Sequence, residues 1–148
     1  MGWFRKSAEQ LITRGAGYAM KGQFDRALAD IDEAIRLDPR RADYYSLRGS
    51  VHWGKDDYDG AIRDYNLAIM LSPKDTAFFA GRGTAYRMKK EYDLAISDFE
   101  EAIRLDPQNA IAFFGRGRST EIQRDRTRTS SRATATSPLT SSSVFLKA

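Results

Sequence analysis

Apolar residues in the first three-quarters of the chain recur at intervals of three and four positions, with polar residues between them. Leu11 and Tyr18 mark one helical face, and Ile31 and Ile35 mark a second face further along. This spacing is typical of amphipathic helices, because strands would alternate at every second position. A polar break at Lys21, Gly22 and Gln23 separates the two faces. The pattern therefore predicts antiparallel helices joined in pairs by tight turns.

A repeat of 34 residues organises these pairs. Pro39, Pro73 and Pro107 each end a similar phrase, Ala-Ile-Arg-Leu-Asp-Pro or Ala-Ile-Met-Leu-Ser-Pro. Proline ends a helix because it pushes the preceding residue out of the helical region. The same interval links three further columns: Gly15, Gly49, Gly83 and Gly117; Ala27, Ala61 and Ala95; Phe24, Tyr58 and Tyr92.

The glycine column lies inside the predicted first helices, where each glycine costs about 1 kcal/mol relative to alanine. A cost repeated at one register needs a compensation. We expect only a hydrogen to fit where the two helices of a pair cross, with the alanine column as the small partner on the second helix. Since one hairpin cannot bury its own apolar face, the hairpins should stack.

These columns resemble the tetratricopeptide repeat, whose pattern places Gly, Tyr, Ala, an aromatic residue, Ala and Pro over 34 residues. The resemblance covers about three-quarters of the chain and implies an all-α, right-handed α-solenoid of antiparallel helix hairpins with about seven helices. His52 and Thr120 replace the usual tyrosine, and Ser72 replaces an aspartate. We divide the chain into a lead-in at 1–7, repeats at 8–41, 42–75 and 76–109, a partial fourth repeat or capping helix at 110–124, and a tail at 125–148.

Charged residues recur with the repeat. Arginine precedes each glycine, and the second helices carry aspartate at matching places: Arg14, Arg48, Arg82 and Arg116; Asp30, Asp64 and Asp98. We predict that each arginine pairs with an aspartate of its own or the preceding hairpin and so fixes the register of stacking. The alternative is a set of separate, solvated charges, and exposed pairs contribute only about 0.2–1 kcal/mol each.

The tail at 125–148 breaks the pattern, since eleven of its 24 residues are Ser or Thr. Such a composition buries too little surface to offset chain entropy, so the sequence predicts disorder there. Two explanations stay open. The tail is either a natural terminus behind a capping helix, or the product of a truncated or frame-altered fourth repeat.

Net charge separates the chain into two parts. Residues 1–114 carry 17 Lys and Arg against 18 Asp and Glu, whereas residues 115–148 carry 7 against 2. Nucleic-acid binding through the basic segment 116–132 is therefore an alternative function, and steep salt dependence would mark it. Another alternative is a structural fragment of a larger multidomain or oligomeric protein, with self-association through the helix at 110–124.

The resemblance also implies a function, because the first helices of such arrays line a concave groove that holds a peptide or helix of a partner protein. The sequence does not identify that partner. Trp53 has an equally good alternative in packing near its turn, and Phe114 would also be exposed if its partner helix were missing. The predicted groove residues are Ile12, Thr13, Ala16, Met20, Ser46, Leu47, Ser50, Trp53, Ala80, Thr84, Arg87, Met88 and Phe114.

Some functions are disfavoured. Members of this family that bind chaperone tails hold a terminal carboxylate with Lys, Asn and Arg. The matching places here lack a charged donor: Ile12, Ala16, Leu47, Ala77 and Gly81. His52 is the only histidine and occupies a core column, so packing is favoured over catalysis, and the acidic clusters are expected on solvated helix faces. We expect a cytoplasmic, non-enzymatic protein without cofactor or metal, and without a signal sequence or membrane span.

Overall fold

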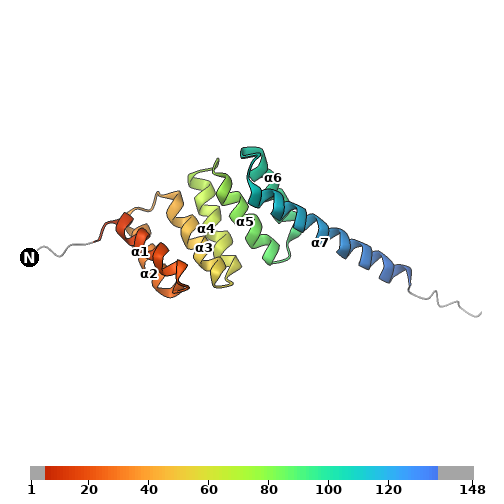
Figure 1. Ribbon diagram of the computed structural model, residues 1–148, viewed down its shortest axis with the longest axis horizontal. Helices are drawn as coiled ribbons and strands as arrows, with labels where there is room; N and C mark the ends of the chain where they lie inside the picture. Colours follow the sequence, from red (N-terminus) through yellow and green to blue (C-terminus); the bar gives the residue numbers. More distant parts are fainter. Residues whose placement is uncertain (1–5, 137–148) are drawn as a thin grey trace, which may run out of the picture.

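Seven α-helices in antiparallel hairpins make up the molecule (Figure 1). The computed structural model describes residues 6–136, and within that range it contains no strand. The all-α fold and the stacked hairpins predicted from the sequence are confirmed. The helices are α1 (Ala8–Met20), α2 (Phe24–Leu37), α3 (Ala42–Gly54), α4 (Tyr58–Leu71), α5 (Thr76–Met88), α6 (Tyr92–Leu105) and α7 (Ala110–Ala135).

Local sequence explains where the helices begin. Ser7 opens α1 with a capping box, in which its hydroxyl accepts from the Gln10 amide and the Gln10 side chain accepts from the Ser7 amide. Asp57 and Asn109 cap α4 and α7 through their side-chain oxygens, which satisfy amides left free at the helix start. The 34-residue repeat thus extends to the ends of the elements.

The turn inside each hairpin uses one residue with positive φ. Gly22, Asp56 and Lys90 lie 34 residues apart, with φ of 71°, 61° and 64°. Glycine adopts this conformation without steric cost, whereas aspartate and lysine do so with some strain. The backbone of the turn therefore repeats even where the residue type does not.

Small and aromatic residues together build a continuous core between hairpins. Ala27, Ala61 and Ala95 are fully buried on the second helices, as the glycine and alanine columns predicted. Tyr65 packs with residues of α5, and Phe99 packs with Ala112 of α7. Each core cluster spans two hairpins, so the stability of one depends on its neighbour.

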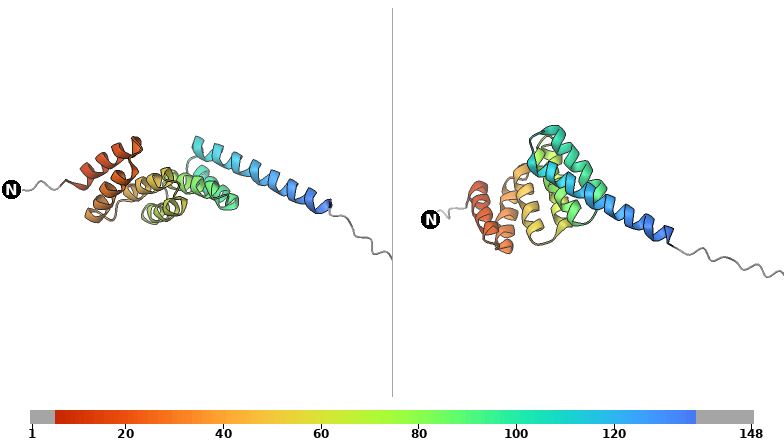
Figure 2. Two further views of the ribbon diagram at one scale, coloured as in Figure 1. Left: turned by 90° about the horizontal axis from the view of Figure 1, so that it is seen from below. Right: turned by 45° about the vertical axis from the view of Figure 1, so that its right-hand side comes forward.

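The stack curves, with its first helices on the inside. α1 contacts α3, α3 contacts α5 and α5 contacts α7, whereas among residues 6–136 no second helix contacts another second helix. In the left view of Figure 2 the first helices form an arc with α2 and α4 on its outer side. We call the surface of α1, α3, α5 and α7 that faces away from the second helices the inner wall.

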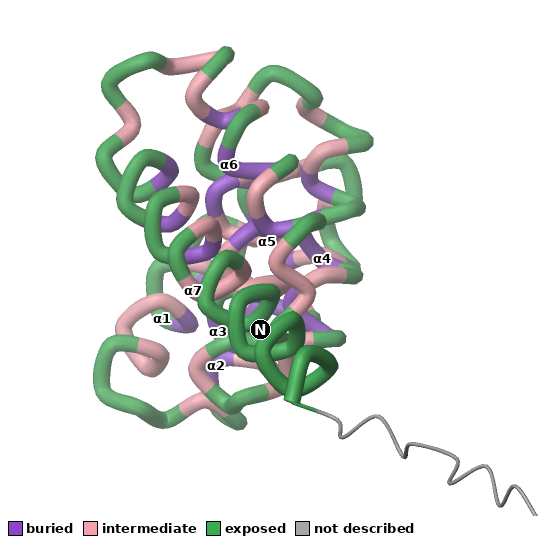
Figure 3. Tube along the Cα trace, turned by 90° about the vertical axis from the view of Figure 1, so that its right-hand side faces the viewer, coloured by how far each residue is buried: buried purple, intermediate pink, exposed green. Residues whose placement is uncertain are grey.

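The end of α7 differs from the sequence prediction. Disorder was predicted from residue 125, and this is wrong for 125–135, which continue α7 as exposed helical turns (Figure 3). Their residues need no core of their own, because the packed N-terminal half of α7 already provides the helix nucleus. Several threonine hydroxyls donate to backbone carbonyls one turn earlier, as Thr129 does to Asp125. The prediction for 137–148 lies outside the described residues.

Candidate functional site

Large apolar side chains are exposed on every helix of the inner wall. Met20 on α1 is 90% exposed and Phe114 on α7 is 69% exposed. Trp53 on α3 and Met88 on α5 are each about two-fifths exposed. Their recurrence on four successive first helices gives the wall four separate apolar contact points along its length.

The other predicted groove residues differ in accessibility. Thr13 and Ser50 are exposed, and six are partly buried: Ile12, Ala16, Ser46, Leu47, Thr84 and Arg87. Leu47 and Ile12 pack against the core cluster of Ala27, Ile31 and Val51, so they offer a ligand only part of their surface. The prediction for Ala80 is wrong, because its side chain is only 3% exposed and packs with Phe99 and Ala112.

Hydroxyl groups on the wall are already used by the protein. Thr13 donates to the Glu9 carbonyl over 2.9 Å, and Thr84 donates to the Ala80 carbonyl over 2.8 Å. Ser50 donates to the Ser46 carbonyl and also contacts the Tyr65 hydroxyl at 3.0 Å. The wall therefore offers few free donors, and its contact with a ligand would be mainly apolar.

Arg87 on α5 adds a positive charge to the wall. Its Nε atom is buried and has no hydrogen-bond partner, and within residues 6–136 no carboxylate pairs with its guanidinium. An unpaired donor of this kind is costly, and an acidic group on a ligand would relieve the cost.

Arginine–aspartate pairs lie behind the wall and hold the hairpins together, as predicted. Arg48 donates to both oxygens of Asp64 over 2.9 and 2.7 Å and reaches back to Asp32 on α2 over 2.9 Å. Arg82 repeats the arrangement with Asp98, and these hydrogen bonds raise the pKa of both guanidinium groups. Each pair links a first helix to its own second helix and so fixes the register of the hairpin.

The first and last arginines of the column show the limits of this ladder. Arg14 binds Asp30, and this hydrogen bonding lowers the pKa of the Asp30 carboxyl. Arg116 has no carboxylate partner within the described chain, and its guanidinium lies 5.5 Å from the centre of the Phe113 ring. The predicted pairing is therefore confirmed for three arginines and wrong for Arg116, since no second helix follows α7.

His52 has a structural role in the turn between α3 and α4. Its Nδ1 lies 2.9 Å from Asp57 Oδ2 and its Nε2 lies 3.7 Å from Asp64 Oδ2. Across residues 6–136 no group of three His, Cys, Asp or Glu side chains could hold a metal ion. None of the seven described helices combines the length and apolarity needed to cross a membrane.

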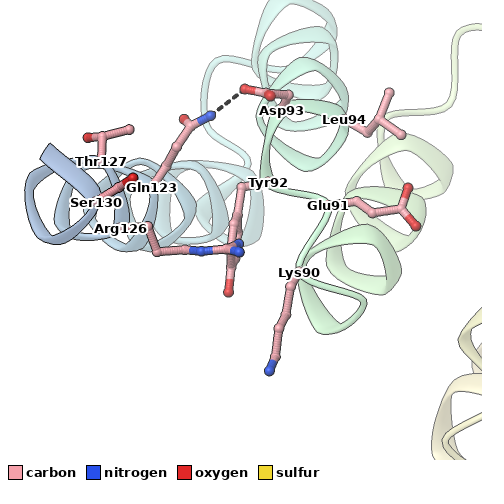
Figure 4. Close-up of a pocket in the computed structure, with 9 residues that line it drawn as sticks. All are labelled: Lys90, Glu91, Tyr92, Asp93, Leu94, Gln123, Arg126, Thr127 and Ser130. Atoms are coloured by element: carbon pink, nitrogen blue, oxygen red, sulfur yellow. Dashed lines mark hydrogen bonds between the residues drawn. The ribbon is translucent and has the colours of Figure 1, made fainter. Parts of the chain in front are cut away.

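A hollow between α6 and α7 was not expected from the sequence, because its far side is formed by residues predicted to be disordered. It measures about 480 Å³ and lies beside Tyr92, whose ring is 5.5 Å from the Arg126 guanidinium (Figure 4). Gln123 donates to Asp93 across its edge. These contacts hold the middle of α7 against the start of α6, so the hollow reports how α7 packs.

Sequence models of the tetratricopeptide repeat match residues 18–76 and residues 77–109, which together make up more than half of the chain. The chain belongs to the tetratricopeptide repeat family. The comparison with curated protein sequences finds no match.

Solved structures of tetratricopeptide repeat domains share the fold. The Arabidopsis OM64 domain is 27% identical with a TM-score of 0.75, and the match covers 78% of this chain and 95% of that one. The second domain of human RPAP3, in complex with the HSP70 peptide SGPTIEEVD, is 25% identical with a TM-score of 0.71 and covers 77% and 98%.

The first tetratricopeptide repeat domain of Spaghetti (RPAP3), bound to the HSP90 peptide SRMEEVD, is 24% identical. Its TM-score is 0.76, over 82% of this chain and 98% of that one, and this likeness shows the fold alone. Family membership and the fold make this tetratricopeptide repeat chain a scaffold for protein interactions.

Proposed function

We propose that the inner wall binds a segment of a partner protein, either an extended peptide or one face of an amphipathic helix. The observation that carries the proposal is the row of exposed apolar side chains, one on each first helix: Met20, Trp53, Met88 and Phe114. A linear ligand laid across the stack would contact several of these residues in turn, which matches the extended surfaces that such arrays use.

The partner segment should combine apolar residues with at least one acidic residue. Arg87 places a guanidinium without a carboxylate partner on the same wall. A carboxylate of the ligand would form a charge-assisted hydrogen bond there. The peptides bound by the two RPAP3 domains are themselves acidic, which supports an acidic ligand by analogy.

A free C-terminal carboxylate is not expected to be the recognised group. The five places that grip it in chaperone-binding members hold uncharged residues without side-chain donors: Ile12, Ala16, Leu47, Ala77 and Gly81. The acidic residue is therefore expected inside the bound segment. A peptide ending in EEVD should bind no better than the same peptide with an amidated C-terminus.

Affinity capture with two matched variants tests the proposal. The inner variant carries Met20→Ala, Trp53→Ala and Met88→Ala. The outer variant removes three similarly exposed apolar residues from the second helices: Leu67→Ala, Met70→Ala and Leu94→Ala. All six side chains are exposed, so both variants should keep the unfolding midpoint of the wild type.

The comparison is quantitative. Proteins captured from a cell lysate by the wild type should be lost from the inner variant and retained by the outer variant. Equal capture by wild type and inner variant would refute the inner wall as the binding surface. Loss with the outer variant alone would assign binding to the convex side.

A further inference from the structure

The last helix presents a surface that is covered in every other hairpin. On α1, α3 and α5 the glycine column faces a second helix. A methyl group at Gly15 would lie 3.3 Å from the Ala27 carbonyl oxygen, and one at Gly83 would lie 3.2 Å from that of Ala95. At Gly117 of α7 a methyl group would meet no atom within 4 Å.

The charge that accompanies this column is also left without a partner. Arg14, Arg48 and Arg82 each hold an aspartate of the following helix, whereas within residues 6–136 Arg116 contacts only the ring of Phe113. A hollow of about 540 Å³ lies along the same side of α7, beside Arg116, Gly117 and Thr120. We call the side formed by Phe113, Arg116, Gly117, Thr120 and Arg124 the open face of α7.

The three complete hairpins show what chemistry fits this face. In each of them the covering helix carries a fully buried alanine, an aspartate three residues later that binds the arginine, and then a large apolar residue. The sequences are Ala27-Leu-Ala-Asp30-Ile, Ala61-Ile-Arg-Asp64-Tyr and Ala95-Ile-Ser-Asp98-Phe. Alanine permits the close approach, aspartate satisfies the guanidinium and the apolar residue fills the space beside it.

We propose that the open face of α7 is a second docking surface, which binds an acidic amphipathic helix of a partner protein carrying Ala-x-x-Asp followed by a large apolar residue. The partner helix would complete a fourth hairpin from another chain. This surface differs from the inner wall in its residues and in its recognition chemistry. It does not depend on the function proposed above.

Charge favours a foreign, acidic helix over the two occupants that this chain could supply. α7 carries six arginines against one glutamate and one aspartate. Pairing with α7 of a second copy would bring like charges together. Residues 137–148 contain no Asp or Glu, so they lack the side chain that Arg116 requires.

The sequence of α6 provides the probe, because α6 already fits the equivalent surface of α5. A labelled peptide of residues 92–105, stapled across the exposed positions 100 and 104 to hold it helical, is titrated with the full chain in a fluorescence anisotropy assay. We expect saturable binding. The same peptide with Asp98→Asn should bind about tenfold more weakly or worse, because it loses a charge-assisted pair.

Two protein variants locate the site. Gly117→Leu fills the open face and should abolish binding, whereas Gly17→Leu places the same side chain on another helical glycine with open space around it and should leave binding unchanged. Absence of saturable binding to the wild type would overturn the proposal. Binding that survives Gly117→Leu would also overturn it, because the peptide would then have replaced α6 or lie on the inner wall.

Sedimentation of the free chain tests the other occupant. A monomer whose mass is unchanged by Gly117→Leu agrees with an open face. A dimer that Gly117→Leu dissociates would assign the face to a second copy and refute the foreign helix.

Discussion

Two glycines on α7 make opposite predictions for the same substitution. Gly115 and Gly117 lie two residues apart in one helix, so replacement by alanine changes the intrinsic helical preference by a similar amount at each. Their surroundings differ. A methyl group at Gly115 would lie 2.6 Å from Cε1 of Phe99, a fully buried ring, whereas one at Gly117 meets open space.

The expected magnitudes follow from these distances. Gly117→Ala should raise the free energy of unfolding by about 1 kcal/mol, which is the helical preference of alanine over glycine. Gly115→Ala gains the same amount but forces the Phe99 ring or α7 to shift, and such overpacking costs about 1–3 kcal/mol. The two variants should therefore differ by about 1–3 kcal/mol, with Gly117→Ala the more stable.

Urea unfolding followed by far-UV circular dichroism measures both values, and thermal melts provide a check. Since 1 kcal/mol corresponds to about 4 °C in a domain of this size, the two midpoints should separate clearly. Equal shifts of the same sign would refute the reasoning. They would mean either that Gly115 does not pack on Phe99 or that another helix already covers Gly117.

Three further predictions concern the arginine–aspartate pairs and the end of α7. Asp64→Ala should cost about 2–3 kcal/mol in urea unfolding, because Arg48 is left partly buried without its bidentate partner; a cost near zero would contradict the structural role of the pair. Stability should fall as the pH drops below about 4, because Arg14 lowers the folded pKa of Asp30, so that the unfolded chain binds the proton more readily. Asp30→Asn should flatten this fall in acid titrations followed by circular dichroism, and an unchanged slope would exclude Asp30 as a source. Deleting 125–148 should lower the helical signal but change the unfolding free energy by less than about 0.5 kcal/mol, because the turns from Arg124 to Ala135 are exposed; a larger loss would show that they stabilise the stack.

The repeat carries most of the fold in its sequence because each column has the same physical task in every hairpin. The alanines pack at the helix crossing, prolines end the second helices, and arginines bind aspartates sixteen residues later. These tasks depend on neighbours inside the same hairpin. The sequence could therefore predict them without knowledge of the wider surroundings.

Predictions failed where the surroundings change from one hairpin to the next. Ala80 belongs to the same column as the exposed Phe114, yet α7 covers it, since its methyl group is small enough to pack against Ala112. Arg116 lacks an aspartate because no helix follows α7. Position in a repeat does not report whether the neighbouring repeat is present.

The helical continuation to Ala135 failed for another reason. Composition indicates whether a segment can bury a core of its own, and 125–135 cannot. A helix that extends from a packed start needs no such core, and the contact of Arg126 with Tyr92 holds it at the point of departure. Helical preference, with two alanines and three arginines in this segment, was the signal that could have indicated it.

Site-specific photocrosslinking tests the central claim, that the curved stack binds its partner along the inner wall. A photoreactive phenylalanine analogue is placed at Trp53 on α3 in one protein and at Met70 on α4 in another, both exposed but on opposite sides of the stack. After capture from a lysate and irradiation, the account predicts a partner adduct from position 53 and none from position 70. Adducts from position 70 alone would contradict it.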